Sequence, residues 1–101
     1  MKSRVIYTAS KGAILGMTIP MARDLGKYGI RVVCIAPGAF DTPLQGDINE
    51  KDKKIVESEI PIGRFGKPEE FAELALELAR NSYINGVDIR VDGGIVLTAK
   101  L

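Results

Sequence analysis

Tyr7 and Lys11 are the residues whose types and spacing most readily suggest chemistry, and they lie four positions apart in the segment YTASK. On a helix this spacing places both side chains on one face, so that an ammonium group can lie near a phenol. Together with the positive N-terminal end of the helix, Lys11 would stabilise the phenolate of Tyr7 and make the phenol a usable acid or base. Because so short a pattern also arises by chance, the rest of the chain has to decide between a site and a coincidence.

The composition excludes several other kinds of site. The 101 residues include no histidine, which removes histidine-based triads and most zinc sites, and no metal site is expected. Cys34 is the single cysteine, so a disulfide framework is excluded. Because Cys34 lies in an apolar run, a small buried thiol is expected there rather than a nucleophile.

Charge and hydropathy also limit the kinds of binding partner and the cellular compartment that can be expected. Lys and Arg number 14 against 13 for Asp and Glu, which gives no electrostatic reason to expect a nucleic acid or an anionic membrane. No apolar stretch has the length of a membrane span, and the first residues lack the apolar core of a secretory signal. A soluble intracellular chain is therefore expected, and the choice between the cytoplasm and the mitochondrial matrix stays open.

The elements that would position Tyr7 and Lys11 can be read along the chain. Residues 8–27 predict a helix with Gly29 as its stop, and Pro20 predicts a local bend or a lost backbone hydrogen bond. Residues 30–38 form a β-branched apolar run that ends in Pro-Gly. A run that is apolar on both faces favours a buried strand, typically in a parallel sheet.

The second half of the chain predicts a flap, a helix and a strand. Residues 39–66 are polar and interrupted, with a short amphipathic helix expected within residues 47–60. Pro68 and the two glutamates after it make a good helix start, because proline suits the first turn and carboxylates suit the positive end. The core face of this helix is predicted to hold Phe71, Ala72, Leu74, Ala75, Leu78 and Ala79. Residues 87–92 predict a last strand, closed by a glycine pair.

The order of elements is therefore helix, strand, flap, helix, strand, and the two strands with their crossover form one βαβ unit. Such a unit is not a whole domain, because parallel sheets are stable when helices cover both faces and two strands have little ladder of their own. The sequence predicts an incomplete α/β fold.

Four segments now identified, YTASKGAILGMT, GIRVVCIAPGAFDTP, GRFGKPEEFA and INGVDIRVDGG, together resemble the C-terminal half of a short-chain dehydrogenase/reductase. The resemblance covers essentially the whole chain in order and spacing. It implies the C-terminal part of a Rossmann-type doubly wound parallel sheet, with residues 1–101 as a partial domain that lacks the N-terminal nucleotide-binding half. In that domain residues 39–66 would be the flap.

The resemblance also implies roles for the first two residues. Tyr7 would be the general acid/base that moves a proton to or from the substrate oxygen. Lys11 would stabilise the phenolate of Tyr7 and hydrogen-bond the nicotinamide ribose hydroxyls. Both residues would therefore contact the cofactor, NAD, as well as take part in catalysis.

Four further residues would bind the cofactor if the resemblance holds. Pro37 and Gly38 would shape the wall beside the nicotinamide, while the Phe40 backbone and Thr42 would hold its carboxamide or the adjacent phosphate. Open α/β sheets bind ligands at the carboxyl ends of their strands, where this Pro-Gly segment falls. The alternative is purely structural: a strand-ending turn at Pro37–Gly38 and a helix cap at Thr42. For Asp92–Gly94 a tight turn is the favoured interpretation.

The implied function is that of an NAD(H)-dependent oxidoreductase that interconverts a secondary alcohol and a ketone, with a hydroxyacyl-CoA or steroid-like small molecule as substrate. The family's glycine-rich phosphate loop, of TGxxxGxG type, is absent from the 101 residues. The family's catalytic serine would precede Met1, and Ser3 is too close to Tyr7 to take its role. A polypeptide that begins at Met1 is therefore expected to be inactive alone.

Two other functions remain open. A non-catalytic truncated paralogue would serve as a structural or assembly subunit, its exposed sheet edge covered by partner chains. An acyl-carrier-protein ketoreductase would share the Tyr7 motif and differ in residues 43–66. The resemblance also implies a homo-oligomer, and the spacing of Gly12 and Gly16 is compatible with close helix packing.

Overall fold

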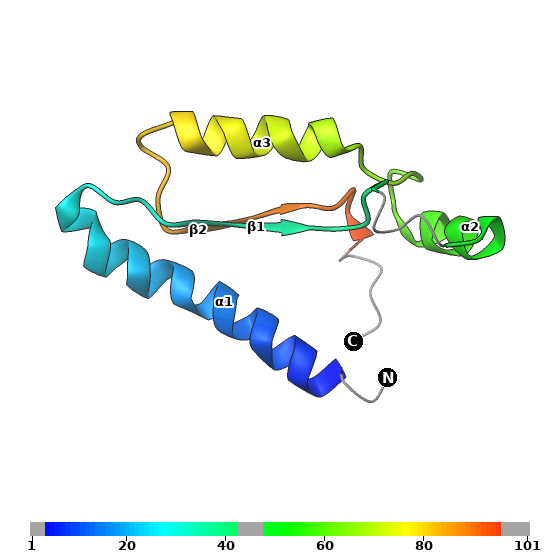
Figure 1. The fold of residues 1–101 in the computed structure, drawn as a ribbon, viewed down its shortest axis with the longest axis horizontal. Coiled ribbons are helices and arrows are strands. Elements are labelled where there is room, and N and C mark those ends of the chain that lie inside the picture. Colours follow the sequence, from blue (N-terminus) through cyan, green and yellow to red (C-terminus); the bar gives the residue numbers. More distant parts are fainter. Residues whose placement is uncertain (1–3, 43–47, 96–101) are drawn as a thin grey trace. The chain divides into compact units, whose positions relative to one another are not determined.

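The computed structural model describes residues 4–42 and 48–95. Its element order is α1 (Arg4–Leu25), η1 (Gly26–Tyr28, a 3-10 turn), β1 (Val33–Pro37), α2 (Glu50–Glu59), α3 (Pro68–Arg80) and β2 (Val87–Val91), as Figure 1 shows. β1 and β2 are hydrogen-bonded neighbours in a two-stranded parallel sheet. The α/β class and the predicted order of helix, strand, flap, helix and strand are confirmed.

The first helix begins earlier than predicted. α1 starts at Arg4 rather than residue 8, so Tyr7 lies within the helix. The prediction erred because Thr8 suits a helix cap, whereas nothing in the preceding Arg-Val-Ile stops a helix. At the other end, Gly29 has a φ of 75° and its N–H donates to the Gly26 carbonyl at 2.9 Å. This left-handed conformation suits glycine, and the predicted stop is confirmed.

The structure divides into two compact units, and the first comprises Met1–Ile35 with Leu78–Ile89. In it Thr18, Ala22 and Leu78 are buried. The Thr18 hydroxyl donates to the Ile14 carbonyl at 3.4 Å, one turn back along α1. Gly86 lies against Ala22, since a Cβ at Gly86 would come within 3.3 Å of the Ala22 Cβ. The core of this unit is therefore small.

Polar contacts tie the start of β1 to the residues before β2. The Arg31 guanidinium donates to the carbonyls of Leu78 and Ala79, each at 2.8 Å, and to that of Ile84 at 3.2 Å. The next residue, Val32, donates its N–H to the Asn85 side chain at 2.8 Å. Cationic donors suit the negative C-terminal end of a helix, so Arg31 stabilises the end of α3.

The second unit comprises Ala36–Glu77 with Arg90–Leu101, and among its described residues the side chains of Ile60 and Phe65 are buried. α2 lies within the predicted residues 47–60, and the Asn49 side chain caps its start by accepting the Asp52 N–H at 2.8 Å. The turn after α2 is hydrogen-bonded to the segment after β2, since the Ile62 N–H donates to the Gly93 carbonyl at 3.2 Å.

Burial is lower than the sequence predicted. Residues Val33–Ala36 of β1 are half-buried rather than buried, and the Cys34 thiol is half-buried and free. On α3, Ala72 and Ala79 are exposed, whereas Phe71, Leu74 and Ala75 are half-buried. The prediction assumed a sheet covered on both faces, and within the described residues the sheet has two strands.

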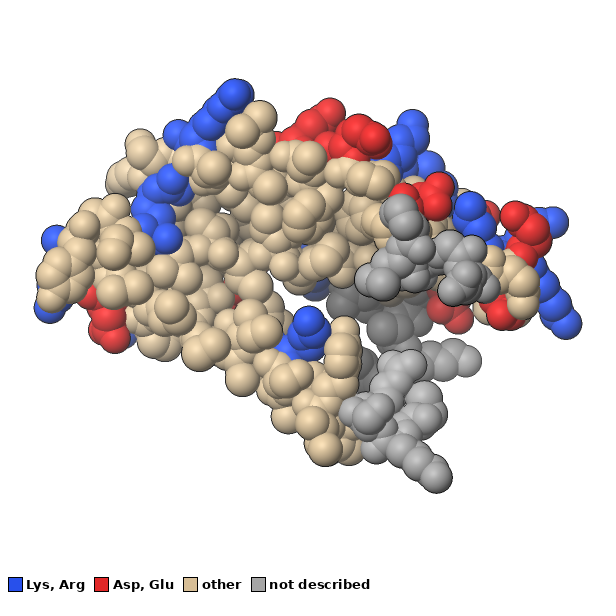
Figure 2. Space-filling view, viewed as in Figure 1, with Lys and Arg blue, Asp and Glu red and all other residues tan. Residues whose placement is uncertain are grey.

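α1 exposes much of its apolar surface. Val5, Ile6 and Ile19 are 81%, 77% and 55% exposed, and in the view of Figure 2 the surface over α1 is largely uncharged. Within the described residues, no helix is long and apolar enough to span a bilayer.

Candidate functional site

Tyr7 and Lys11 lie one turn apart on α1, in the first unit. The Lys11 Nζ is 5.4 Å from the centroid of the Tyr7 ring, within cation–π range. Tyr7 is 61% exposed, and the Ser10 hydroxyl, three residues later, donates to the Tyr7 carbonyl at 2.7 Å. The phenol is therefore accessible to a ligand and has an ammonium beside it.

A second tyrosine–lysine pair has nearly the same distance between ammonium and ring as the Tyr7 pair. The Lys27 Nζ is 5.3 Å from the centroid of the Tyr28 ring, which is 68% exposed. The two residues are adjacent in η1, so their proximity follows from chain connectivity. The distance in the Tyr7 pair is thus not distinctive by itself, and a functional role for that pair depends on the sequence pattern around it.

Gly38 has a structural role in the second unit. Its N–H donates to the Val91 carbonyl at 3.1 Å, directly after β1 ends at Pro37. A Cβ at Gly38 would lie 2.6 Å from the Asp92 Cβ and 2.8 Å from the Asp92 Cα. Only glycine permits two backbone segments to approach this closely. A contact with a cofactor remains a prediction for Pro37 and Gly38.

Phe40 forms an isolated parallel bridge with Gly66. The Gly66 N–H donates to the Ala39 carbonyl and the Asp41 N–H donates to the Gly66 carbonyl, both at 2.9 Å. In this register the N–H and C=O of Phe40 itself point to the opposite edge of the segment. The Phe40 ring meets the Phe71 ring edge-to-face, with centroids 5.9 Å apart and planes at 87°. Thr42, half-buried, follows two residues later.

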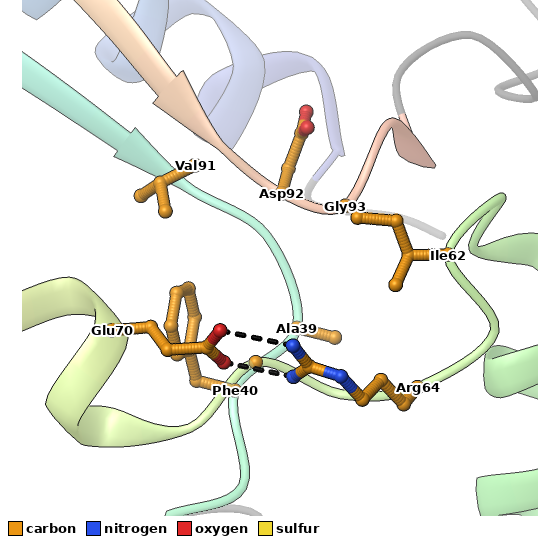
Figure 3. Close-up of a pocket in the computed structure, with 9 residues that line it drawn as sticks. Ala39, Phe40, Ile62, Arg64, Glu70, Val91, Asp92 and Gly93 are labelled. Carbon is orange, nitrogen blue, oxygen red and sulfur yellow. Dashed lines mark hydrogen bonds and ion pairs between the residues drawn. The ribbon is translucent and has the colours of Figure 1, made fainter.

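Arg64 and Glu70 form a two-pronged ion pair next to this bridge (Figure 3). Arg64 Nη1 donates to Glu70 Oε1 at 2.8 Å and Nη2 donates to Oε2 at 2.9 Å. Glu70 Oε1 also accepts the Lys67 N–H at 2.8 Å. The hydrogen bond from Arg64 and then that from Lys67 lower the pKa of Glu70 from 4.5 to about 2. The carboxylate therefore stays ionised at neutral pH.

The sequence interpretation missed this pair. It treated GRFGKPEEFA as a turn and a helix start, and assigned no partner to Arg64. The available signal was the position of Glu70. It lies three residues after Lys67, the N-cap residue of α3, which is the position of the glutamate in a capping box.

A cavity of about 140 Å³ lies between the Arg64–Glu70 pair and the end of β2. Figure 3 shows Val91, Asp92, Gly93 and Ile62 opposite the ion pair. Pockets that hold cofactors or drug-sized ligands usually measure about 300–1,000 Å³, so this cavity is too small to hold a dinucleotide. Phe40 lines it, whereas Pro37, Gly38 and Thr42 do not.

The predicted residues fall into two sets. Tyr7 and Lys11 belong to the first unit, and the residues from Pro37 to Thr42 belong to the second. That the two sets form one site stays a prediction. Among the described residues, no three His, Cys, Asp or Glu side chains are grouped so that they could hold a metal ion.

Comparison with known proteins identifies relatives over nearly the whole chain. The sequence model of a family described as enoyl-(acyl carrier protein) reductase matches residues 1–96. The 3-hydroxyacyl-CoA dehydrogenase type-2 of Homo sapiens is 49% identical over 90 residues, which cover 88% of this chain and 34% of that protein. The 3-oxoacyl-(acyl-carrier-protein) reductase of Thermotoga maritima is 45% identical over 93 residues, covering 90% of this chain and 38% of that protein.

Solved structures agree with these matches. The crystal structure of 3-hydroxyacyl-CoA dehydrogenase type-2 from Mycobacterium avium superposes with a TM-score of 0.82 at 44% identity, covering 86% of this chain and 34% of that one. A variant of a Serratia marcescens short-chain dehydrogenase/reductase gives a TM-score of 0.80 at 39% identity, with 90% and 38% covered.

Two segments of the sequence, MTIPMARDLGKYGIRV and PGAFDTPL, most resemble 3-hydroxyacyl-CoA dehydrogenase type-2, and the matches to that enzyme agree with this resemblance. The last two residues of the second segment lie outside the described residues. The chain spans about a third of the length of the curated relatives that it matches. Their folds are of the Rossmann type. The family match and the identities together establish that the chain belongs to the short-chain dehydrogenase/reductase family.

Proposed function

We propose that this chain is the acid/base part of an NAD(H)-dependent oxidoreductase that interconverts a secondary alcohol and a ketone, with 3-hydroxyacyl-CoA and 3-oxoacyl-CoA as the substrate pair. Its relatives are oxidoreductases, which supports the general role. The observation that supports the proposal is the exposed Tyr7–Lys11 pair on α1, in a segment, YTASK, that resembles the family motif.

In the proposed mechanism Tyr7 gives its hydroxyl proton to the substrate oxygen when a ketone is reduced, and takes a proton back when an alcohol is oxidised. The Lys11 ammonium stabilises the phenolate that forms between these steps. It would also hydrogen-bond the ribose of the cofactor. The nicotinamide of bound NAD(H) supplies or accepts the hydride.

The residues of the second unit fit the role of holding a nicotinamide. An amide needs both a donor and an acceptor, and the peptide groups of Phe40 offer these on the edge away from Gly66. The Thr42 hydroxyl would bind the carboxamide or the adjacent phosphate. Pro37 and Gly38 would form the wall beside the ring, with Gly38 fixed against Asp92.

The substrate and cofactor can be tested on the native polypeptide that contains these residues, after its intact mass has been measured. The expected result is consumption of NADH with acetoacetyl-CoA. Faster turnover of an acyl-carrier-protein thioester would identify that thioester as the substrate in place of acyl-CoA. A preference for NADPH would identify NADP(H) as the cofactor in place of NAD(H). A folded native polypeptide that neither binds NADH nor reduces either thioester would contradict the proposal.

One observation favours a different function. The exposed apolar side chains of α1, among them those of Val5 and Ile6, suit coverage by another polypeptide. A non-catalytic structural or assembly subunit, or a homo-oligomer, would use this surface, in the cytoplasm or the mitochondrial matrix. Co-purification in a defined complex without NADH binding would favour the subunit over the enzyme.

A further inference from the structure

We infer that Arg64 and Glu70 are positioning residues, whose ion pair fixes the backbone of Ala39–Asp41 and thereby aims the Phe40 peptide groups at the cofactor. The inference rests on the proposed function for its cofactor. The positioning itself is a statement about the second unit alone, so it can be tested without any ligand. Four contacts form the connection from the ion pair to Phe40.

The first contact is the bridge. Gly66 uses both of its backbone polar groups on this segment, accepting from the Asp41 N–H and donating to the Ala39 carbonyl. The position of Gly66 therefore sets the position of the peptide groups on either side of Phe40.

The second contact is between the Phe40 ring and Gly66. A Cβ at Gly66 would lie 2.6 Å from the Phe40 Cε2 and 2.8 Å from its Cδ2, so the ring covers the glycine directly. The edge-to-face contact with Phe71 also holds the Phe40 ring against α3. Phe40 is thus held by its ring as well as by its neighbours' backbone.

The third and fourth contacts fix Gly66 from both sides. On the N-terminal side, Arg64 is held by the Glu70 carboxylate and also donates to the Phe65 carbonyl at 3.0 Å. On the C-terminal side, Lys67 donates its N–H to the same carboxylate. Glu70 therefore holds the residues before and after Gly66 in one arrangement, and bidentate geometry makes that arrangement specific.

The pair is partly exposed, with 49% of the Arg64 side chain and 39% of the Glu70 side chain accessible. Exposed ion pairs contribute little to global stability, so its main effect is expected to be local. Losing it should loosen the bridge without unfolding the chain.

Amide hydrogen exchange on the native polypeptide, without ligand, tests the positioning. In Glu70→Gln and in Arg64→Met, exchange of the Asp41 and Gly66 amides should become about two- to fivefold faster. The effect of the double variant should be smaller than the sum of the two single effects, because both single variants remove the same ion pair. Glu69→Gln is the matched control, since it removes a carboxylate from the same turn of α3. The Gly86 amide, which donates to the Val32 carbonyl in the other unit, reports any global loss of structure.

NADH binding to the native polypeptide tests the link to the cofactor. The dissociation constant for NADH should rise about two- to fivefold in the two Arg64 and Glu70 variants and stay unchanged in Glu69→Gln. Unchanged exchange at Asp41 and Gly66 would overturn the positioning role, whatever the NADH result. Faster exchange with unaltered NADH affinity would overturn the cofactor link. If the wild-type polypeptide does not bind NADH, both the proposed function and the cofactor link are refuted. The exchange rates of the Asp41 and Gly66 amides would still test the positioning role.

Discussion

The two sets of candidate residues are held in different ways. Tyr7 stands on an exposed stretch of α1, and its place beside Lys11 follows from helical spacing. Phe40 is held by a bridge to Gly66 and a ring contact with Phe71, residues far away in the sequence. The geometry of the acid/base pair therefore requires only a helix, whereas that of the proposed cofactor segment requires tertiary contacts. Substitutions should therefore affect chemistry at the first set and local structure at the second.

The largest effect is expected from Tyr7→Phe. Removal of the proton donor should lower the turnover of the active native polypeptide by about 10²–10⁴-fold, the usual contribution of general acid/base catalysis. NADH affinity and the fold should change little, because the Tyr7 ring is exposed. The measurement is steady-state turnover together with NADH binding.

Tyr28→Phe is the control for that substitution. Tyr28 is similarly exposed and has Lys27 beside its ring at nearly the same distance. Its turnover should equal that of the wild type. Equal losses in both variants would mean that Tyr7 has no special role.

Two glycine substitutions contrast the crowded and the open region. Gly38→Ala should destabilise the 101-residue chain by about 1–3 kcal/mol, because its Cβ would meet the Asp92 backbone and Cβ. Gly12→Ala should stabilise it by about 1 kcal/mol, because a Cβ there meets no atom within 4 Å and alanine favours the helix. Denaturant unfolding gives both values. A stabilising Gly38→Ala would show that the close approach is not required.

Arg31→Lys should cost about 1 kcal/mol in unfolding free energy. The guanidinium reaches the Leu78, Ala79 and Ile84 carbonyls with two nitrogens, and a single ammonium does not reproduce that fork. Arg23→Lys, on the exposed face of α1, is the control and should change the unfolding free energy little. Equal effects of the two substitutions would argue against a stabilising role for Arg31.

The smallest effect is the pH dependence due to Glu70. Its pKa is about 2 in the folded chain against an ordinary value of 4.5, so its contribution to stability is present above pH 4.5 and is lost as the pH falls toward 2. The difference in unfolding free energy between wild type and Glu70→Gln should therefore be constant near neutrality and shrink in that acidic window. Salt should weaken it, because the pair is partly exposed. A difference that grows on acidification would contradict the ion pair.

Local features were predictable from the sequence and long-range ones were not. Pro68 begins α3 because proline fixes the backbone angle that suits a first helical turn, and Gly29 ends the first helical segment because glycine readily adopts the left-handed conformation found there. The contacts of Arg31 with the end of α3 join residues 47 and 48 positions apart, and the Phe40–Gly66 bridge is also long-range. Periodicity and turn chemistry carry no signal for such pairs, so the sequence identified Phe40 only through a resemblance and left Arg64 without a role.

The most direct test of the central claim is a crystal structure of the native polypeptide with NADH and a hydroxyacyl-CoA analogue. The account predicts that the Tyr7 hydroxyl lies within hydrogen-bond distance of the substrate oxygen, with Lys11 on the nicotinamide ribose and the Phe40 peptide on the carboxamide. A nicotinamide bound with Tyr7 and Lys11 pointing away from it, or with the Pro37–Gly38 corner far from both, would contradict the account.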